Sequence, residues 1–90
     1  MRAIFVMIRC ELGCAYQVAN HLMDEIQQTS EVHSISGEFD LLAKFRLDSE
    51  EDIGRFVCET VQPSPGIAAT FTIISLNPFT QDHGRFGDNP

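Results

Sequence analysis

Residues 2–10 restrict the folds open to this chain more than any other segment, because apolar side chains occupy successive positions in it. A β-strand over Ala3 to Ile8 would present apolar side chains on both of its faces, since neighbouring side chains point to opposite sides of a sheet. Strands of this kind are typical of the centre of a sheet that is covered on each side. The sequence therefore predicts a central strand over residues 2–10 and requires a cover for both of its faces.

A helical pattern follows this strand. From Cys14 to about Gln28, apolar residues recur at helical intervals and polar residues fill the opposite side. The apolar members are Ala15, Val18, Ala19, Leu22 and Ile26. This segment is predicted to be an amphipathic helix that packs on the sheet.

Two strand-like runs come next, with a short turn between them. Residues 32–36 and 39–47 form the runs, and Gly37-Glu38 stands where a two-residue hairpin has its loop. Gly37 suits the first loop position of a type II′ turn, which needs a positive φ. The second run alternates, with Leu41, Ala43, Phe45 and Leu47 on one face and Asp40, Leu42, Lys44 and Arg46 on the other. The pattern predicts a β-hairpin with one face toward the core.

A second helix and a fourth strand complete the domain. Ser49 with Asp52 resembles a capping box, and a stripe of Ile53, Phe56, Val57 and Val61 predicts a helix from Ser49 to about Gln62. The Pro and Gly residues of 63–66 end that helix. Residues 67–76 then alternate as a strand, with Ala69, Phe71 and Ile73 opposite Thr70, Thr72 and Ile74. Residues 1–78 are predicted to form one domain, and residues 79–90 a polar C-terminal tail.

The order of these elements is βαββαβ with short connections. Right-handed crossovers then favour a split βαβ arrangement, an α+β fold in which both helices cover one face of a four-stranded antiparallel sheet. The other face stays bare, although the first strand is apolar on both sides and the second side of the last strand carries Thr, Ile and Leu. We expect a second copy of the chain to cover this face and form a homodimer, sheet against sheet.

Charge and composition exclude several classes of function. Thirteen acidic and six basic residues leave a net charge of −7, which opposes a phosphate backbone, so direct binding to nucleic acid is not expected. No segment approaches the roughly 18 apolar residues that span a bilayer, and we expect a cytoplasmic protein without a membrane partner. The three cysteines are an odd number without framework spacing, which fits reduced thiols.

The turn at Gly37-Glu38-Phe39-Asp40 is the best candidate for a binding site. A turn of this kind can direct backbone N–H groups to one spot, and Asp40 places a negative charge nearby. An amino acid carries a carboxylate for the amides and an ammonium group for Asp40. The alternative is purely structural, with Gly37 needed for backbone geometry and Asp40 hydrogen-bonded to the turn.

No catalytic or metal site is evident in the sequence. Cys10 and Cys14 lie at a strand–helix junction, but their spacing is one residue longer than Cys-x-x-Cys and no third ligand accompanies them. The three histidines are scattered, so general acid or base catalysis has no evident residue. We expect neither a cofactor nor a metal, and we do not expect an enzyme.

Three segments together resemble the ligand-binding domain of the Lrp/AsnC (feast/famine) transcriptional regulators. They are residues 32–45, Phe56-Val57 and residues 65–74, which contain a Gly-x-aromatic-Asp turn, a Pro-Gly pair and a Thr-x-Thr strand motif. The resemblance implies a ferredoxin-like domain that dimerises through its sheets and often builds an octamer of four dimers. It also implies sensing of an amino acid effector at contacts between dimers.

The resemblance assigns a role to particular residues as well. By position, the effector-binding residues would be Gly37, Glu38, Phe39, Asp40, Thr70 and Thr72. Thr70 and Thr72 are equally well explained as ordinary strand residues. Full-length family members carry an N-terminal helix-turn-helix, whereas here the first strand begins at once, so the resemblance is to the sensing domain alone.

Such a domain would regulate transcription without its own DNA-binding domain, either by joining a full-length Lrp/AsnC regulator or by buffering the effector. Two alternatives stay open. The same dimeric α+β architecture also occurs in small monooxygenases and isomerases, and the chain could instead be a purely structural oligomerisation partner.

Overall fold

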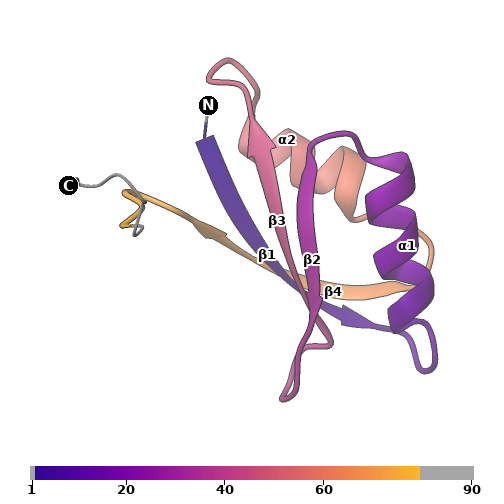
Figure 1. The fold of residues 1–90 in the computed structure, drawn as a ribbon. Helices are drawn as coiled ribbons and strands as arrows, with labels where there is room; N and C mark the ends of the chain where they lie inside the picture. The colour runs from indigo at the N-terminus through magenta and orange to yellow at the C-terminus, as the bar shows by residue number, and fades with distance from the viewer. Residues whose placement is uncertain (1, 80–90) are drawn as a thin grey trace.

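The computed structural model describes residues 2–79 and contains a single four-stranded sheet within that range. The elements are β1 (Arg2–Cys10), α1 (Ala15–Glu25), β2 (Thr29–Ser34), β3 (Leu41–Leu47), α2 (Ile53–Phe56), η1 (Val57–Val61) and β4 (Ile67–Ile74). The strand order is β2-β3-β1-β4, every pair is antiparallel, and the helices cover one face of the sheet (Figure 1). The predicted ferredoxin-like α+β fold is confirmed.

β1 is a central strand, as its apolar pattern predicts, and it pairs with both β3 and β4. Ile4, Val6 and Ile8 are fully buried on the face that the helices cover. Phe5 and Met7 point to the other face and are only half-buried. The fold therefore covers one side of β1 and leaves an open face on the other side.

The core lies between the sheet and the helices. β3 contributes four buried residues, Leu41, Ala43, Phe45 and Leu47, which are the four that the alternation predicts for the inner face. α1 adds Val18 and Leu22, and the second helical segment adds Phe56, Val57 and Val61. The rings of Phe45 and Phe56 meet edge to face with their centroids 5.1 Å apart. This contact fixes the second helical segment on the sheet.

α1 is shorter than predicted and ends at Glu25 rather than near Gln28. Ile26 adopts an extended conformation and stays buried, so its side chain still belongs to the core although the helix has ended. The hydroxyl of Thr29 donates to the carbonyl oxygen of Leu22 at 2.8 Å, which also accepts from the N–H of Ile26, and so ties the end of α1 to β2. The periodic apolar pattern thus extends beyond the helix itself.

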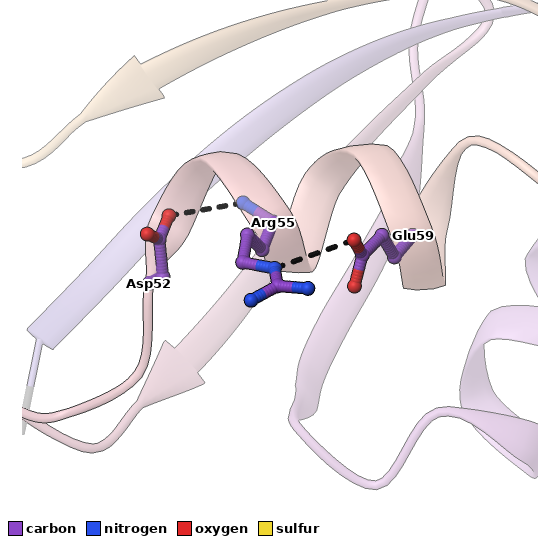
Figure 2. Close-up of polar contacts among 3 residues, drawn as sticks. All are labelled: Asp52, Arg55 and Glu59. Atoms are coloured by element: carbon purple, nitrogen blue, oxygen red, sulfur yellow. Dashed lines mark hydrogen bonds and ion pairs between the residues drawn. The ribbon is translucent and has the colours of Figure 1, made fainter.

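The second helix begins at Ile53, and the predicted start at Ser49 is wrong. Glu51 closes a separate turn, because its carboxylate accepts from the N–H of Asp48 at 2.9 Å. Asp52 is the N-cap and accepts from the N–H of Arg55 at 3.0 Å, while the Arg55 side chain contacts Glu59 (Figure 2). From Val57 the helix widens to π geometry, η1, which ends at Val61 rather than at Gln62.

The connection between β2 and β3 is a six-residue loop, so the predicted two-residue hairpin turn is wrong. The last strand pair is Ser34 with Leu41, and beyond it the N–H of Ile35 donates to the carbonyl oxygen of Asp40. Gly37 has a φ of 113°, which confirms the predicted positive φ. Asp40 is bonded to β1 as well, through its N–H to Ile8 and through its carboxylate to Cys10. The loop projects past the end of the sheet (Figure 1).

The two sides of β4 are oriented oppositely to the prediction: the side that was expected on the open face of the sheet is turned toward the helices. Thr70 and Thr72 pair with Ile8 and Val6, which face the helices, whereas Phe71 pairs with Met7 on the open face. The prediction that Thr, Ile and Leu of this strand line the bare face is therefore wrong. The open face of β4 instead carries Ala69, Phe71 and Ile73.

Within residues 2–79, no helix is both long enough and apolar enough to cross a membrane. The predicted tail, residues 79–90, lies outside the described residues except for Phe79.

Candidate functional site

The loop at residues 37–40 is attached to the end of β1, and Asp40 makes the attachment. The N–H of Asp40 donates to the carbonyl oxygen of Ile8, and the N–H of Cys10 donates to Oδ2 of Asp40, both at 2.8 Å. The register between β1 and β4 shifts between Arg9 and Cys10, so the backbone there is irregular. One oxygen of the Asp40 carboxylate is thus held in place, and Oδ1 has no protein donor among the described residues.

Arg9 joins this site, although the sequence analysis did not select it. Its Nε donates to the carbonyl oxygen of Glu38 at 3.1 Å, and its guanidinium carbon lies 5.1 Å from the centre of the Phe39 ring. Phe39 in turn lies against Phe71, with ring centroids 6.4 Å apart. The sequence feature that could have identified Arg9 as a site residue is that it is the sole charged residue in the segment 3–10.

A pocket of about 480 Å³ opens beside the loop, between the end of β1 and the start of α1. Its walls are formed by Arg9, Cys10, Glu11, Leu12, Gly13, Ala15, Tyr16, Glu38 and Asp40. The lining holds three carboxylates and one guanidinium, together with the ring of Tyr16 and apolar side chains. Such a pocket offers a partner for a carboxylate and several partners for an ammonium group.

The loop also supplies free backbone donors. Within residues 2–79, the N–H groups of Gly37, Glu38 and Phe39 donate to no protein acceptor. The loop is exposed at Gly37 and Glu38, so water or a ligand can satisfy these groups. The loop therefore holds unpaired backbone donors in the same segment as Asp40, and their convergence on one ligand stays a prediction.

Thr70 and Thr72 lie apart from this group. Both face the helix side of the sheet, and neither lines the pocket beside Asp40. The hydroxyl of Thr70 accepts from Nε2 of Gln62 at 2.9 Å, which ties β4 to the end of the second helix. Of the six residues selected from the sequence, Glu38 and Asp40 line the pocket, and Gly37 and Phe39 belong to the same loop. A ligand role stays a prediction for all six.

The Cys10 thiol beside the pocket is protonated at neutral pH rather than poised for chemistry. Burial raises the pKa of Cys10, and the nearby charges of Asp40 and Cys14 raise it further. Over residues 2–79, no three His, Cys, Asp or Glu side chains are arranged to hold a metal ion.

The family of the Lrp/AsnC ligand binding domain matches residues 3–84 of this chain. The chain belongs to that family. Because the family consists of ligand-binding domains of transcriptional regulators, this Lrp/AsnC domain is not an enzyme.

A curated relative of this Lrp/AsnC domain is an uncharacterized HTH-type transcriptional regulator from Pyrococcus abyssi. The two are 32% identical over 75 residues, which cover 81% of this chain and 50% of the regulator. The chain thus spans about half the length of the curated relatives that it matches.

Solved structures of other proteins share the fold of this chain. The crystal structure of FFRP-DM1 superposes with a TM-score of 0.77 at 26% identity, covering 84% of this chain and 100% of that one. A transcriptional regulator from Neisseria meningitidis, solved as its L-Met complex, has a TM-score of 0.76 and covers 91% of this chain and 54% of its own. Its identity is only 13%, so it supports the fold alone.

Proposed function

We propose that this domain senses a free amino acid at the pocket beside Asp40 and uses the bound effector to control the assembly of a transcriptional regulator. The observation that carries the proposal is that the Arg9 guanidinium and the Asp40 carboxylate line one pocket together with Glu38, whose N–H donates to no acceptor among the described residues. The α-carboxylate of the ligand would accept from the loop amides or Arg9. Its α-ammonium would donate to Asp40, which still has one free oxygen.

The energies are adequate for a metabolite sensor. A hydrogen bond to a charged group contributes about 1.5–3 kcal/mol, and millimolar affinity needs only about 4 kcal/mol in total. One anchor at each end of the zwitterion would therefore suffice. The Neisseria meningitidis regulator was solved with L-methionine, which makes this amino acid the natural first ligand to test here.

The open face of the sheet supports assembly with a second copy. Phe71 and Ile73 are 56% and 41% exposed there, and Phe5, Met7 and Leu42 lie beside them on β1 and β3. An apolar sheet face of this kind is a common interaction surface in soluble domains. We propose a homodimer with sheet against sheet, from which larger rings such as four dimers would be built.

Action on transcription would then pass through a partner. The net charge of −7 disfavours direct contact of this domain with DNA, so the proposal is that it joins a full-length Lrp/AsnC regulator or competes with that regulator for the effector. A purely structural role in the assembly is the competing function, and it predicts indifference to every amino acid.

Thermal unfolding against the free amino acids tests the proposal directly. A ligand at about 100 times its dissociation constant stabilises the fold by roughly 2.7 kcal/mol, which is several degrees for a domain of this size. The amide and the N-acetyl derivative of the best ligand serve as matched controls, because each removes the charge at one end of the zwitterion. We expect both derivatives to lose the shift. A panel without any shift, from a protein whose assembly is intact, would refute sensing and leave the structural role.

A further inference from the structure

The pocket beside Asp40 has two sides that differ in chemistry, which we call the loop side and the helix side. The β2–β3 loop and the connection from β1 to α1 lie at the same end of the sheet, and each supplies one side (Figure 1). The loop side carries Arg9, Glu38 and Asp40, and the helix side carries Glu11, Leu12, Gly13, Ala15 and Tyr16. The volume of about 480 Å³ falls within the range of about 300–1,000 Å³ that is typical of small-molecule sites.

The loop side accounts for the α-carbon end of an amino acid. In the function proposed above, Arg9 or the loop amides bind the α-carboxylate and Asp40 binds the α-ammonium. Arg9 is held beside the loop, because its Nε donates to the carbonyl oxygen of Glu38 and its guanidinium lies over the Phe39 ring. The side chain of a ligand anchored there is left to meet the helix side.

Glu11 carries the one charge of the helix side, and its backbone is held in place. Its N–H donates to the carbonyl oxygen of Gly66 at 2.8 Å, and its own carbonyl oxygen accepts from the N–H of Cys14 at 3.0 Å. Within residues 2–79, the Glu11 carboxylate takes part in no ion pair. An anchored residue thus presents an uncompensated carboxylate at the pocket.

Two uncovered side chains accompany this carboxylate. Leu12 is fully exposed, and Tyr16, in the first turn of α1, is 76% exposed, although both line the pocket. Aliphatic and aromatic surface of this kind can pack against a chain of methylene groups. The face of a tyrosine ring also attracts a cation. The helix side therefore combines the components that recognise a cation at the end of an apolar chain.

The charge of the whole pocket leads to the same class of ligand. Three carboxylates and one guanidinium line it, so two negative charges stay uncompensated, and a zwitterion with a neutral side chain would leave this excess unchanged. By the strand register, Arg2, Lys44 and Arg46 lie away from the pocket, from the middle of the sheet to its far end. An uncompensated negative pocket favours a ligand with a net positive charge.

We propose that the effector of this domain is an amino acid with a cationic side chain, such as lysine or arginine. The proposal rests on the amino acid sensing proposed above and names the class of side chain at that same pocket. The methylene groups would pack against Leu12 and the Tyr16 ring, and the terminal cation would pair with Glu11. Acidic amino acids are disfavoured, because their side chain would meet a carboxylate and no free cation.

Isothermal titration at constant ionic strength tests the inference with matched ligands. Norleucine has the aliphatic chain of lysine without its ammonium group, and citrulline has the shape of arginine without its charge. We expect each cationic amino acid to bind about fivefold more tightly than its neutral counterpart, which is near the upper limit for an exposed ion pair. Glutamate should bind more weakly than either neutral ligand.

Glu11→Gln isolates the residue that makes the distinction. This variant should bind lysine no more tightly than norleucine, and its affinity for norleucine should equal that of the wild type, which also shows that the variant is folded. The matched control is Glu25→Gln, an exposed change at the far end of α1 outside the pocket. It should keep the full preference for lysine, so a loss of preference in both variants would refute a specific role for Glu11.

The possible failures are distinguishable. Norleucine that binds as tightly as lysine would overturn the cationic class and leave amino acid sensing intact. Cadaverine, the diamine of lysine without its carboxylate, should bind more weakly than lysine, and equal binding would overturn an amino acid as the ligand. A protein that binds no amino acid at all would refute the proposed function and this inference together.

Discussion

Two replacements of Asp40 separate its structural role from its proposed ligand role. Asparagine removes the negative charge alone, whereas alanine removes both the charge and the hydrogen-bond acceptor. Oδ2 of Asp40 accepts from the N–H of Cys10 at 2.8 Å, in a part-buried position. Asp40→Asn keeps an oxygen acceptor for this N–H and removes only the negative charge. Asp40→Ala removes the acceptor as well and leaves the N–H of Cys10 without a partner.

The two substitutions should therefore differ in stability. A hydrogen bond to a charged acceptor contributes about 1.5–3 kcal/mol and a neutral one about 0.5–1.5 kcal/mol, so Asp40→Asn should cost about 1 kcal/mol. Leaving a buried donor unsatisfied costs about 1–3 kcal/mol, so Asp40→Ala should be the more destabilised variant. Urea unfolding of both variants at pH 7 measures the difference.

Ligand affinity, unlike stability, should fall to a similar extent in both variants. Both variants lose the charge that would pair with the α-ammonium, so both should bind the amino acid effector about tenfold to one-hundredfold more weakly, since about 1.4 kcal/mol corresponds to a factor of ten. Asp24→Asn, an exposed change on α1 away from the pocket, is the control for general charge. Wild-type affinity in Asp40→Asn would refute the ammonium role, and equal destabilisation of the two variants would refute the hydrogen-bond account.

Three further outcomes are expected. Gly66→Ala should destabilise the fold by about 1–3 kcal/mol more than Gly37→Ala in urea unfolding. Both glycines have positive φ, but only a Cβ at Gly66 would meet another side chain closely, Cγ2 of Val18 at 2.9 Å. Equal losses of unfolding free energy in the two variants would contradict this packing argument. Phe71→Asp should shift the protein from dimer toward monomer in sedimentation experiments, because it places a charge on the open face. Leu12→Asp, on a loop outside the open face, is the control and should leave the dimer unchanged. An unchanged dimer in Phe71→Asp would count against the proposed interface. Hydrogen bonds from Asp48 and Gln28 lower the pKa of Glu51, so this residue adds stability above pH ~4.3 that is lost as the pH falls through its folded value. Glu51→Gln should flatten the acid limb of stability measured by unfolding between pH 7 and 3, and an unchanged limb would exclude the effect.

The candidate site was partly readable from the sequence. Gly37 and Asp40 stand out locally, because a positive φ and a carboxylate beside a turn are encoded by residue type. Arg9 was missed, because its contacts with Glu38 and Phe39 join residues about thirty positions apart and depend on the β1–β3 pairing.

The sequence by itself determined the fold class, the central position of β1 and the inward face of β3, because these follow from hydrophobic periodicity, which is a local property. Only the tertiary structure decided where α1 ends, where α2 begins, and that Thr70 and Thr72 face the helices. Helix ends depend on partners such as Thr29 and Asp52, and the facing of an alternating strand depends on its register with β1. An alternating strand has two possible orientations, and its long-range pairing is what selects one of them.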